Sequence, residues 1–95
     1  MKTSEEIFLE ELKKEFIEKL KTDVENIRQA VAEKNHATIA RIAHDIKGTI
    51  GIFGFHEGTG LALNLQLAAE EGVWPRIDAS LAALMNYLVE KDIVR

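Results

Sequence analysis

Apolar residues recur at three- and four-residue spacings over the first third of the chain, with no proline or glycine between them. This spacing places them on one face of a helix, so the pattern predicts an amphipathic helix over about residues 5–33. Thr3 or Ser4 can cap its start. Thr22 and Asp23 could cap a second start and divide the helix in two, and the pattern leaves both alternatives open. The apolar positions are Ile7, Phe8, Leu12, Phe16, Leu20, Val24, Ile27 and Val31.

Polar and glycine positions delimit a second and a third helix. A short polar segment ends the first pattern, and Asn35 within it can cap a helix over about residues 36–53. Gly54 marks the end of that helix. The third helix is predicted over about residues 57–71, and Gly72 is its expected C′ residue, because glycine adopts the left-handed conformation that ends many helices.

A fourth helix is predicted from Trp74-Pro75 to about Glu90, because proline is favoured in the first helical turn. No segment alternates apolar and polar residues as a half-buried strand would, and all connections are short. Short connections make successive helices antiparallel, so the sequence predicts an all-α, up-down-up-down four-helix bundle. The apolar positions of the fourth helix are Ile77, Leu81, Leu84, Met85 and Leu88.

The composition indicates one globular domain spanning residues 1–95. Of the 95 residues, 46% are hydrophobic and 29% are charged, as in ordinary globular proteins. No apolar run is long enough to span a membrane, and we expect a cytoplasmic protein. The absence of cysteine excludes disulfides and thiolate chemistry, and the net charge of −4 argues against a nucleic-acid surface. The apolar stripes need no second chain to cover them, so we expect a monomer.

His44 lies on the outward face of the second predicted helix, opposite the apolar stripe. Small residues surround it on that face: Ala37 and Ala40 precede it, and Gly48 and Gly51 follow it. An interior glycine costs a helix about 1 kcal/mol relative to alanine, and exposed faces usually carry long polar side chains. A bare helix face around one imidazole therefore indicates close approach by another molecule.

Lys47 adds a positive charge beside this histidine, since residues three apart on a helix are neighbours. It can offset the charge of an anion bound there. No group of residues has the spacing of a metal site, and no metal is predicted. The predicted access and docking surface around the histidine consists of Ala40, Arg41, Gly48 and Gly51.

The other chemically active side chains are interpreted as surface or structural residues. Asp45 lies about 100° round the helix from His44 and is interpreted as a surface carboxylate. His36 and His56 are interpreted as surface or capping residues, and Trp74 as a lid on one end of the core. A solvent-facing histidine on a helix is itself usually an ordinary surface residue, so the functional interpretation depends on its neighbours.

Residues 43–48, Ala-His-Asp-Ile-Lys-Gly, are followed by small residues and then by Phe-Gly-Phe at residues 53–55. This pattern resembles histidine phosphotransfer (HPt) domains, including the phosphotransfer domain of chemotaxis histidine kinases. The resemblance covers most of the chain, and residues 39–72 carry nearly all of its specificity. Members of the family are four-helix bundles, which agrees with the helices predicted from the apolar pattern.

The resemblance implies roles for particular residues. His44 would be the phosphoryl acceptor, Lys47 the cation beside the phosphoryl group, and Gly48 a position kept small for access. Family members commonly place a Gln or Glu on the next helix to hydrogen-bond the second nitrogen of the histidine, and by register Gln66 occupies that place. Chemotaxis-type domains carry a second histidine where this chain has Leu63, which favours a general phosphorelay module.

The function implied is that of a phosphoryl carrier rather than an autonomous enzyme. A neutral imidazole would accept a phosphoryl group from an aspartyl phosphate of a response-regulator receiver domain, or from a histidine kinase, and pass it to another aspartate. The expected partners are therefore a receiver domain and a histidine kinase. No cofactor is expected on this chain, and Mg²⁺ is expected to come with the receiver.

Two alternatives stay open. The dimerisation helix of a sensor histidine kinase also has a histidine followed by an acidic, an apolar and a basic residue. A Thr-Pro pair normally comes next in those kinases, whereas this chain has Gly48 and Thr49. The second alternative is a non-catalytic helical adaptor that uses the bare helix face for docking only.

Overall fold

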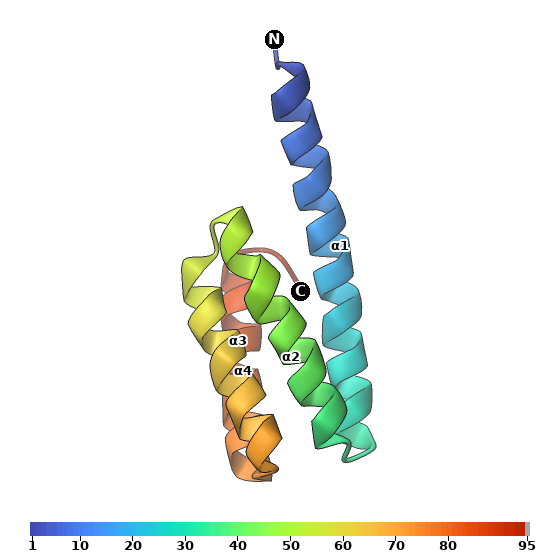
Figure 1. The fold of residues 1–95 in the computed structure, drawn as a ribbon, viewed down its shortest axis with the longest axis vertical. Helices are drawn as coiled ribbons and strands as arrows, with labels where there is room; N and C mark the ends of the chain where they lie inside the picture. Colours follow the sequence, from blue (N-terminus) through green and yellow to red (C-terminus); the bar gives the residue numbers. More distant parts are fainter. Residues whose placement is uncertain (95) are drawn as a thin grey trace.

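A computed structural model describes residues 1–94, which form four α-helices and one short 3₁₀ helix (Figure 1). Successive α-helices run in opposite directions, and residues 1–94 contain no strand. The predicted all-α, up-down-up-down bundle is therefore confirmed. The elements are α1 (Ser4–Ala32), α2 (His36–Ile50), η1 (Gly51–Phe53), α3 (His56–Glu71) and α4 (Trp74–Glu90).

α1 is one uninterrupted helix, which decides between the two alternatives that the sequence left open. At its start, Oγ1 of Thr3 accepts a hydrogen bond from the backbone N–H of Glu6 at 3.1 Å. The hydroxyl of Thr22 donates to the carbonyl oxygen of Glu18, one turn earlier, at 3.3 Å. Because this hydroxyl is bonded within the helix, it does not cap a new start.

The second helix is shorter than predicted, since α2 ends at Ile50 and η1 carries the chain on to Gly54. Gly54 has a φ of 91°, in the left-handed region that favours glycine, so the predicted stop is confirmed. Asn35 caps α2 as expected, because its Oδ1 accepts from the backbone N–H of Thr38 at 3.2 Å. Gly72 ends α3 with a φ of 70°.

The core lies between the four helices, and α3 contributes several small side chains to it. Leu63 and Leu67 are 37% and 43% exposed, whereas Ala62, Ala68 and Ala69 are fully buried. Helices that meet through small side chains pack at shorter distances, so α3 lies close to its neighbours. The largest fully buried side chains are Leu20, Ile27, Ile39, Ile46, Ile50, Leu65, Ile77, Leu84 and Leu88.

Two contacts fix the antiparallel register of α2 and α3. A Cβ at Gly58 would lie 2.5 Å from Cδ1 of Ile50, so the helices meet there with no room for a larger residue. At the far end of the pair, Nδ1 of His36 donates to the carbonyl oxygen of Ala69 at 2.9 Å. His36 therefore bridges two helices, beyond the surface or capping role that the sequence suggested.

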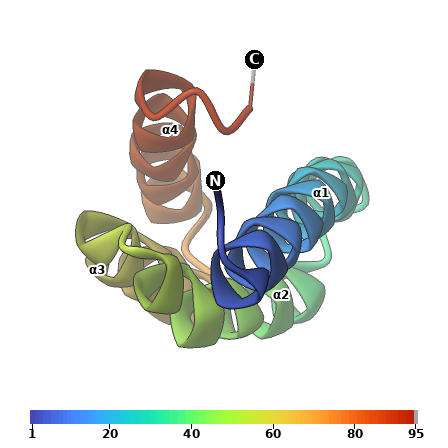
Figure 2. The same ribbon diagram turned by 90° about the horizontal axis from the view of Figure 1, so that it is seen from above.

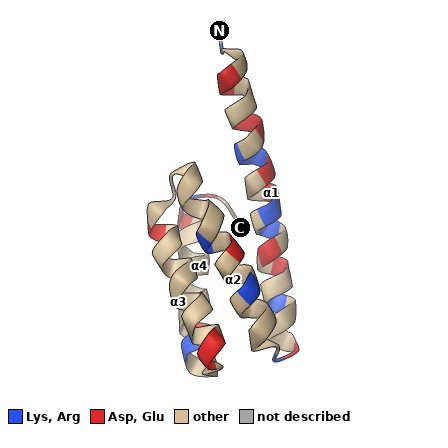
Figure 3. Cartoon of the chain, in the orientation of Figure 1, with Lys and Arg blue, Asp and Glu red and all other residues tan. Residues whose placement is uncertain are grey.

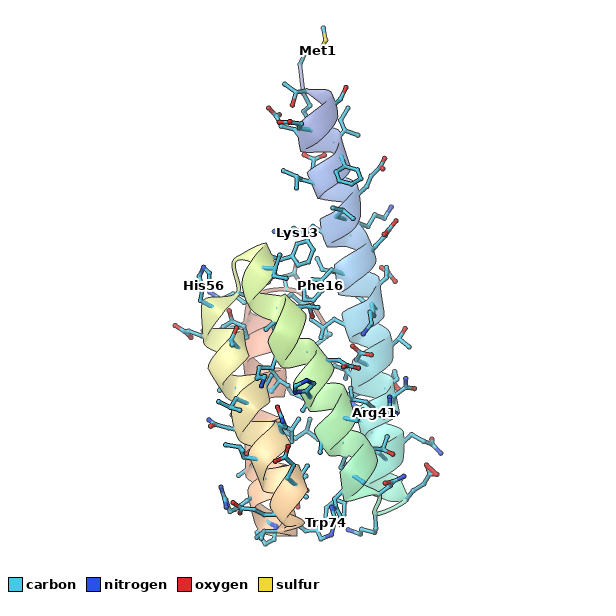
Figure 4. All side chains as sticks on the ribbon, in the orientation of Figure 1. Met1, Lys13, Phe16, Arg41, His56 and Trp74 are labelled. Carbon is cyan, nitrogen blue, oxygen red and sulfur yellow. The ribbon has the colours of Figure 1, made fainter. Side chains whose placement is uncertain are left out.

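Aromatic rings cover both ends of the bundle. Phe16 of α1 stacks on Phe53 of η1 with ring centroids 4.6 Å apart, and Figure 4 shows Phe16 near the upper end of α2. At the opposite end, Trp74 is partly buried against the core, and the ammonium of Lys34 lies 4.7 Å from its ring centroid. The interpretation of Trp74 as a lid on one end of the core is confirmed.

The segment after α4 also contributes to the core, which the sequence analysis did not predict. Ile93 and Val94 are buried, and the backbone N–H of Ile93 donates to the carbonyl oxygen of Leu88 at 2.9 Å. These two residues line a depression together with Val24 and Arg28 of α1. Figure 2 shows the segment extending from α4 toward α1.

The first turns of α1 project beyond the other helices (Figures 1 and 4). Phe8 and Leu9 are each 60% exposed there, because no other helix reaches this height. This part of the apolar stripe is uncovered, contrary to the expectation from the sequence. No helix within residues 1–94 combines the length and the apolar character needed to cross a membrane.

We expect Gly58→Ala to destabilise the bundle by about 1–3 kcal/mol, because its Cβ would meet the buried side chain of Ile50 and lie 3.2 Å from Cε2 of Tyr87. Gly60→Ala is the matched control on the same helix, where a Cβ would meet nothing within 4 Å. It should stabilise the fold by up to about 1 kcal/mol through helix propensity. Urea unfolding measures both, and equal stability of the two variants would contradict the close packing at Gly58.

Candidate functional site

His44 lies in the middle of α2, on its exposed face. The helix is held against the core by an apolar stripe at three- and four-residue spacings, and the imidazole is on the opposite side. The predicted outward placement of this ring is confirmed. The buried residues of α2 are Ile39, Ile42, Ala43, Ile46 and Ile50.

A shallow depression lies beside His44, on the side of α2 that faces α1. A Cβ at Gly48 would meet no atom within 4 Å, so the space above this residue is open. On the turn before His44, Ala40 is half-buried and Arg41 is exposed. The depression is lined by Lys19 of α1 and by His44, Asp45, Gly48 and Thr49 of α2.

Gly51 has a packing role that the sequence analysis did not identify. A Cβ at this position would lie 2.8 Å from Oγ1 of Thr59 on α3. Gly51 is half-buried, whereas Gly48 is exposed. The close approach of α3 explains the glycine at position 51, and open space around the histidine explains the one at position 48. The two glycines therefore differ in what they do for the structure.

Lys47 lies on the other side of His44 from the depression. An α-helix turns about 100° per residue, so Asp45 is displaced about 100° one way and Lys47 about 60° the other way. Asp45 lines the depression toward α1, which places Lys47 on the side of α3. The side chain of Lys47 is half-buried, and within residues 1–94 it forms no ion pair. Its charge is therefore available beside the imidazole.

Gln66 of α3 lies at about the height of His44. Gly51 approaches Thr59 of α3. His44 lies seven positions before Gly51 and Gln66 seven positions after Thr59, so on antiparallel helices the two residues lie at about the same height. Nε2 of Gln66 donates to Oε1 of Glu70 at 2.8 Å. Its Oε1 is buried and has no partner within residues 1–94, and none of the described hydrogen bonds joins it to His44. The orienting role of Gln66 stays a prediction, and a free acceptor is present for it.

Lys19 is the residue of this surface that sequence reasoning missed. It lies 25 positions before His44 and on a different helix, so no local spacing connects the two residues (44 − 19 = 25). Figure 3 shows that charged residues are spread along α1, so one lysine among them gives no distinguishing signal. Only the packing of α1 beside α2 brings it to the depression.

The arrangement suits attack by an imidazole on an electrophile that approaches from solvent. One ring is exposed, the adjoining helix surface is bare at Gly48, and cationic side chains lie on both sides of it. A cation near the ring favours an anionic electrophile. Within residues 1–94, no three His, Cys, Asp or Glu side chains are grouped as a metal site would require.

Comparison with known protein families gives one match. The model of the family described as "Hpt domain" matches residues 11–91, which is most of the chain and includes α2, α3 and α4. No curated protein and no solved structure matches the chain.

The different roles of Gly48 and Gly51 can be tested by stability. We expect Gly51→Ala to be less stable than Gly48→Ala by about 1 kcal/mol, because the hydroxyl of Thr59 must move aside in the first variant only. Adding Thr59→Ala to Gly51→Ala should recover most of this loss. Thermal and urea unfolding measure all three proteins, and equal stability of the two alanine variants would contradict the packing role.

Proposed function

The chain belongs to the Hpt domain family, and we propose that His44 is its phosphoryl-accepting residue. Members of the family carry phosphoryl groups by histidine phosphotransfer in phosphorelays, interact with receiver domains, and are carriers rather than catalytic enzymes. The observation that carries the assignment is the exposed imidazole on α2, next to the open space at Gly48. A docked receiver needs that space.

The other two histidines are less suited to this role. Nδ1 of His36 is bonded to the carbonyl oxygen of Ala69, and its ring packs edge-on against Trp74. His56 is exposed at the first residue of α3, outside the depression that contains His44. His56 is followed one turn later by the open position Gly60, as His44 is by Gly48, but the residue three positions after His56 is Thr59 rather than a lysine.

The proposed reaction is an in-line transfer of the phosphoryl group. Nε2 of the neutral imidazole attacks phosphorus, the bond between phosphorus and the aspartyl oxygen breaks, and its electron pair returns to the carboxylate. The ring gains the phosphoryl group, and its Nδ1 proton can pass to solvent. The reverse sequence of bond changes delivers the group to another aspartate. Mg²⁺ belongs to the receiver, and no step requires a metal on this chain.

Lys47 and Gln66 are proposed to assist His44 in different ways. The ammonium of Lys47 offsets negative charge on the transferring group, acting as a point charge. The free Oε1 of Gln66 can accept from Nδ1–H of the imidazole, which would leave Nε2 unprotonated as the nucleophile. This proposal is supported by the similar heights of the two residues on adjacent helices.

We also propose a histidine kinase as a partner, as the source of phosphoryl groups for the receiver or for this chain. The competing interpretation as a docking adaptor requires binding without covalent transfer. That residues 1–95 form a single domain and that the protein is a monomer remain predictions from the sequence. The adaptor and the carrier differ in whether phosphorus becomes bonded to His44, so labelling separates them.

We expect a phosphorylated receiver, with Mg²⁺, to label this chain with an acid-labile and alkali-stable phosphoryl group. His44→Gln should abolish the label completely, because an amide cannot replace the nucleophilic nitrogen. His56→Gln, another exposed histidine changed in the same way, should keep it. Circular dichroism checks that both variants fold. Undiminished label on a folded His44→Gln protein would falsify the assignment.

We expect Gly48→Gln to fold at least as stably as the parent while accepting the phosphoryl group at least about tenfold more slowly, because a long side chain in the open space would hold the receiver away. Gly60→Gln makes the same change on α3, also in open space, and should leave the rate unaltered. Rapid-quench measurement of transfer from the receiver gives both rates. A folded Gly48→Gln protein that accepts the phosphoryl group at the parent rate would contradict the proposed role of the open space at Gly48.

A further inference from the structure

We propose that Lys19 of α1 is a second cation for the phosphoryl group on His44, contacting it from the side opposite Lys47. The inference rests on the proposed function of His44. Lys19 and His44 line the same depression, although they come from different helices. Lys47 lies on the α3 side of the imidazole and Lys19 on the α1 side. A phosphoryl group on the ring would therefore have an ammonium on each flank.

The ion pair of Lys19 places its charge at the height of the histidine. A second depression runs between the antiparallel α1 and α2, from Asp23 to Glu33 on one side and from Asp45 back to Asn35 on the other, so Asp23 and Asp45 lie at the same end of it. Nζ of Lys19 lies 2.9 Å from Oδ2 of Asp23, one turn further along α1. This contact draws the ammonium along α1 toward the level of Asp45, which directly follows His44.

The charges around the depression leave Lys19 able to change partner. Its side chain is 61% exposed, whereas that of Asp23 is 15% exposed, so the lysine is the more mobile member of the pair. Asp45 lines the same depression and adds a second negative charge near the ammonium. A phosphoryl group carries about 1.5 to 2 negative charges near neutral pH, more than either carboxylate. The ammonium therefore gains by turning from Asp23 to the phosphorylated ring.

Two cations on different helices would contact the phosphoryl group from two sides, which a single lysine cannot do. Lys47 is attached to the same helix as His44, so it accompanies the ring whether or not α1 is in place. Lys19 adds a contact to a different phosphoryl oxygen and makes phosphohistidine stability depend on the packing of α1 against α2. Because Lys19 is mostly exposed, salt should weaken its contribution.

The test uses phosphoramidate as a small phosphoryl donor, which removes the receiver from the measurement. Its P–N bond breaks with release of ammonia as the bond to the His44 ring forms. After donor removal, phosphorus NMR follows loss of the phosphoryl group from the full chain. We expect Lys19→Gln to lose it about two- to fivefold faster than the parent, the range for an exposed ion pair. The difference should shrink at high salt.

Lys21→Gln is the matched control, because it removes the same charge from α1 at a residue that does not line the depression. Lys21 is 51% exposed and pairs with Glu18, so its setting resembles that of Lys19. Its phosphohistidine should decay at the parent rate. Equal decay of Lys19→Gln and Lys21→Gln proteins would overturn the proposal.

We expect Asp23→Asn to change the decay rate of phosphohistidine in the opposite direction. Without its carboxylate partner, Lys19 should contact the phosphoryl group more fully, so phosphohistidine should decay more slowly than in the parent. If this gain acts through the lysine, most of it should disappear in the Lys19→Gln background, as a double-mutant cycle measures. A gain of the same size in both backgrounds would also overturn the proposal.

The outcomes separate this inference from the function on which it rests. Failure of phosphoramidate to label His44 in the parent, with His44→Gln giving the same signal, would reject the acceptor assignment. Normal labelling of His44 combined with unchanged decay in Lys19→Gln would reject the role of Lys19 alone. Circular dichroism of each variant excludes loss of fold as the cause.

Discussion

The close packing of α2 against α3 is the constraint on which the rest of the structure depends. Gly58 and Gly51 allow side chains of the opposite helix to approach to distances that a Cβ would prevent, and the bond from His36 to Ala69 holds the far end of the pair. These contacts fix the height of one helix against the other. They thereby place the buried Oε1 of Gln66, which has no partner within the described residues, near the level of His44, whose imidazole lies on the solvent-facing side of α2.

The surface around His44, which we propose accepts the phosphoryl group, is assembled from three helices. α2 alone provides the exposed imidazole, the neighbouring lysine and the open position at Gly48, since all three follow from helical spacing. α3 packs against α2 and provides the polar side chain of Gln66. α1 provides a further positive charge, that of Lys19, at the edge of the depression. Such a division is suited to a carrier, because the reacting group stays accessible while the surrounding helices keep it in one orientation.

Helical periodicity was sufficient to predict the four helices and the exposure of His44, while short connections predicted their antiparallel order and residue types predicted the cap at Asn35 and a cap at Thr3 or Ser4. Contacts between distant residues were not accessible to it. No pattern marked Ala62 and Ala69 of α3 as core residues, or the buried Ile93 and Val94 after the last helix. The packing role of Gly51 and the proximity of Lys19 likewise depend on which helices become neighbours, which spacing along one helix does not specify.

The buried segment after α4 bears on how the chain acquires its fold. Each helix packs on the next one in the sequence, so most contacts join residues that are close along the chain and can form early. Ile93 and Val94 line one depression together with Val24, and the segment between these positions covers most of the sequence. Ordering so long a loop costs conformational entropy, which favours forming the contact after the helices have associated. We therefore expect residues 93 and 94 to become ordered last, after the helices have associated.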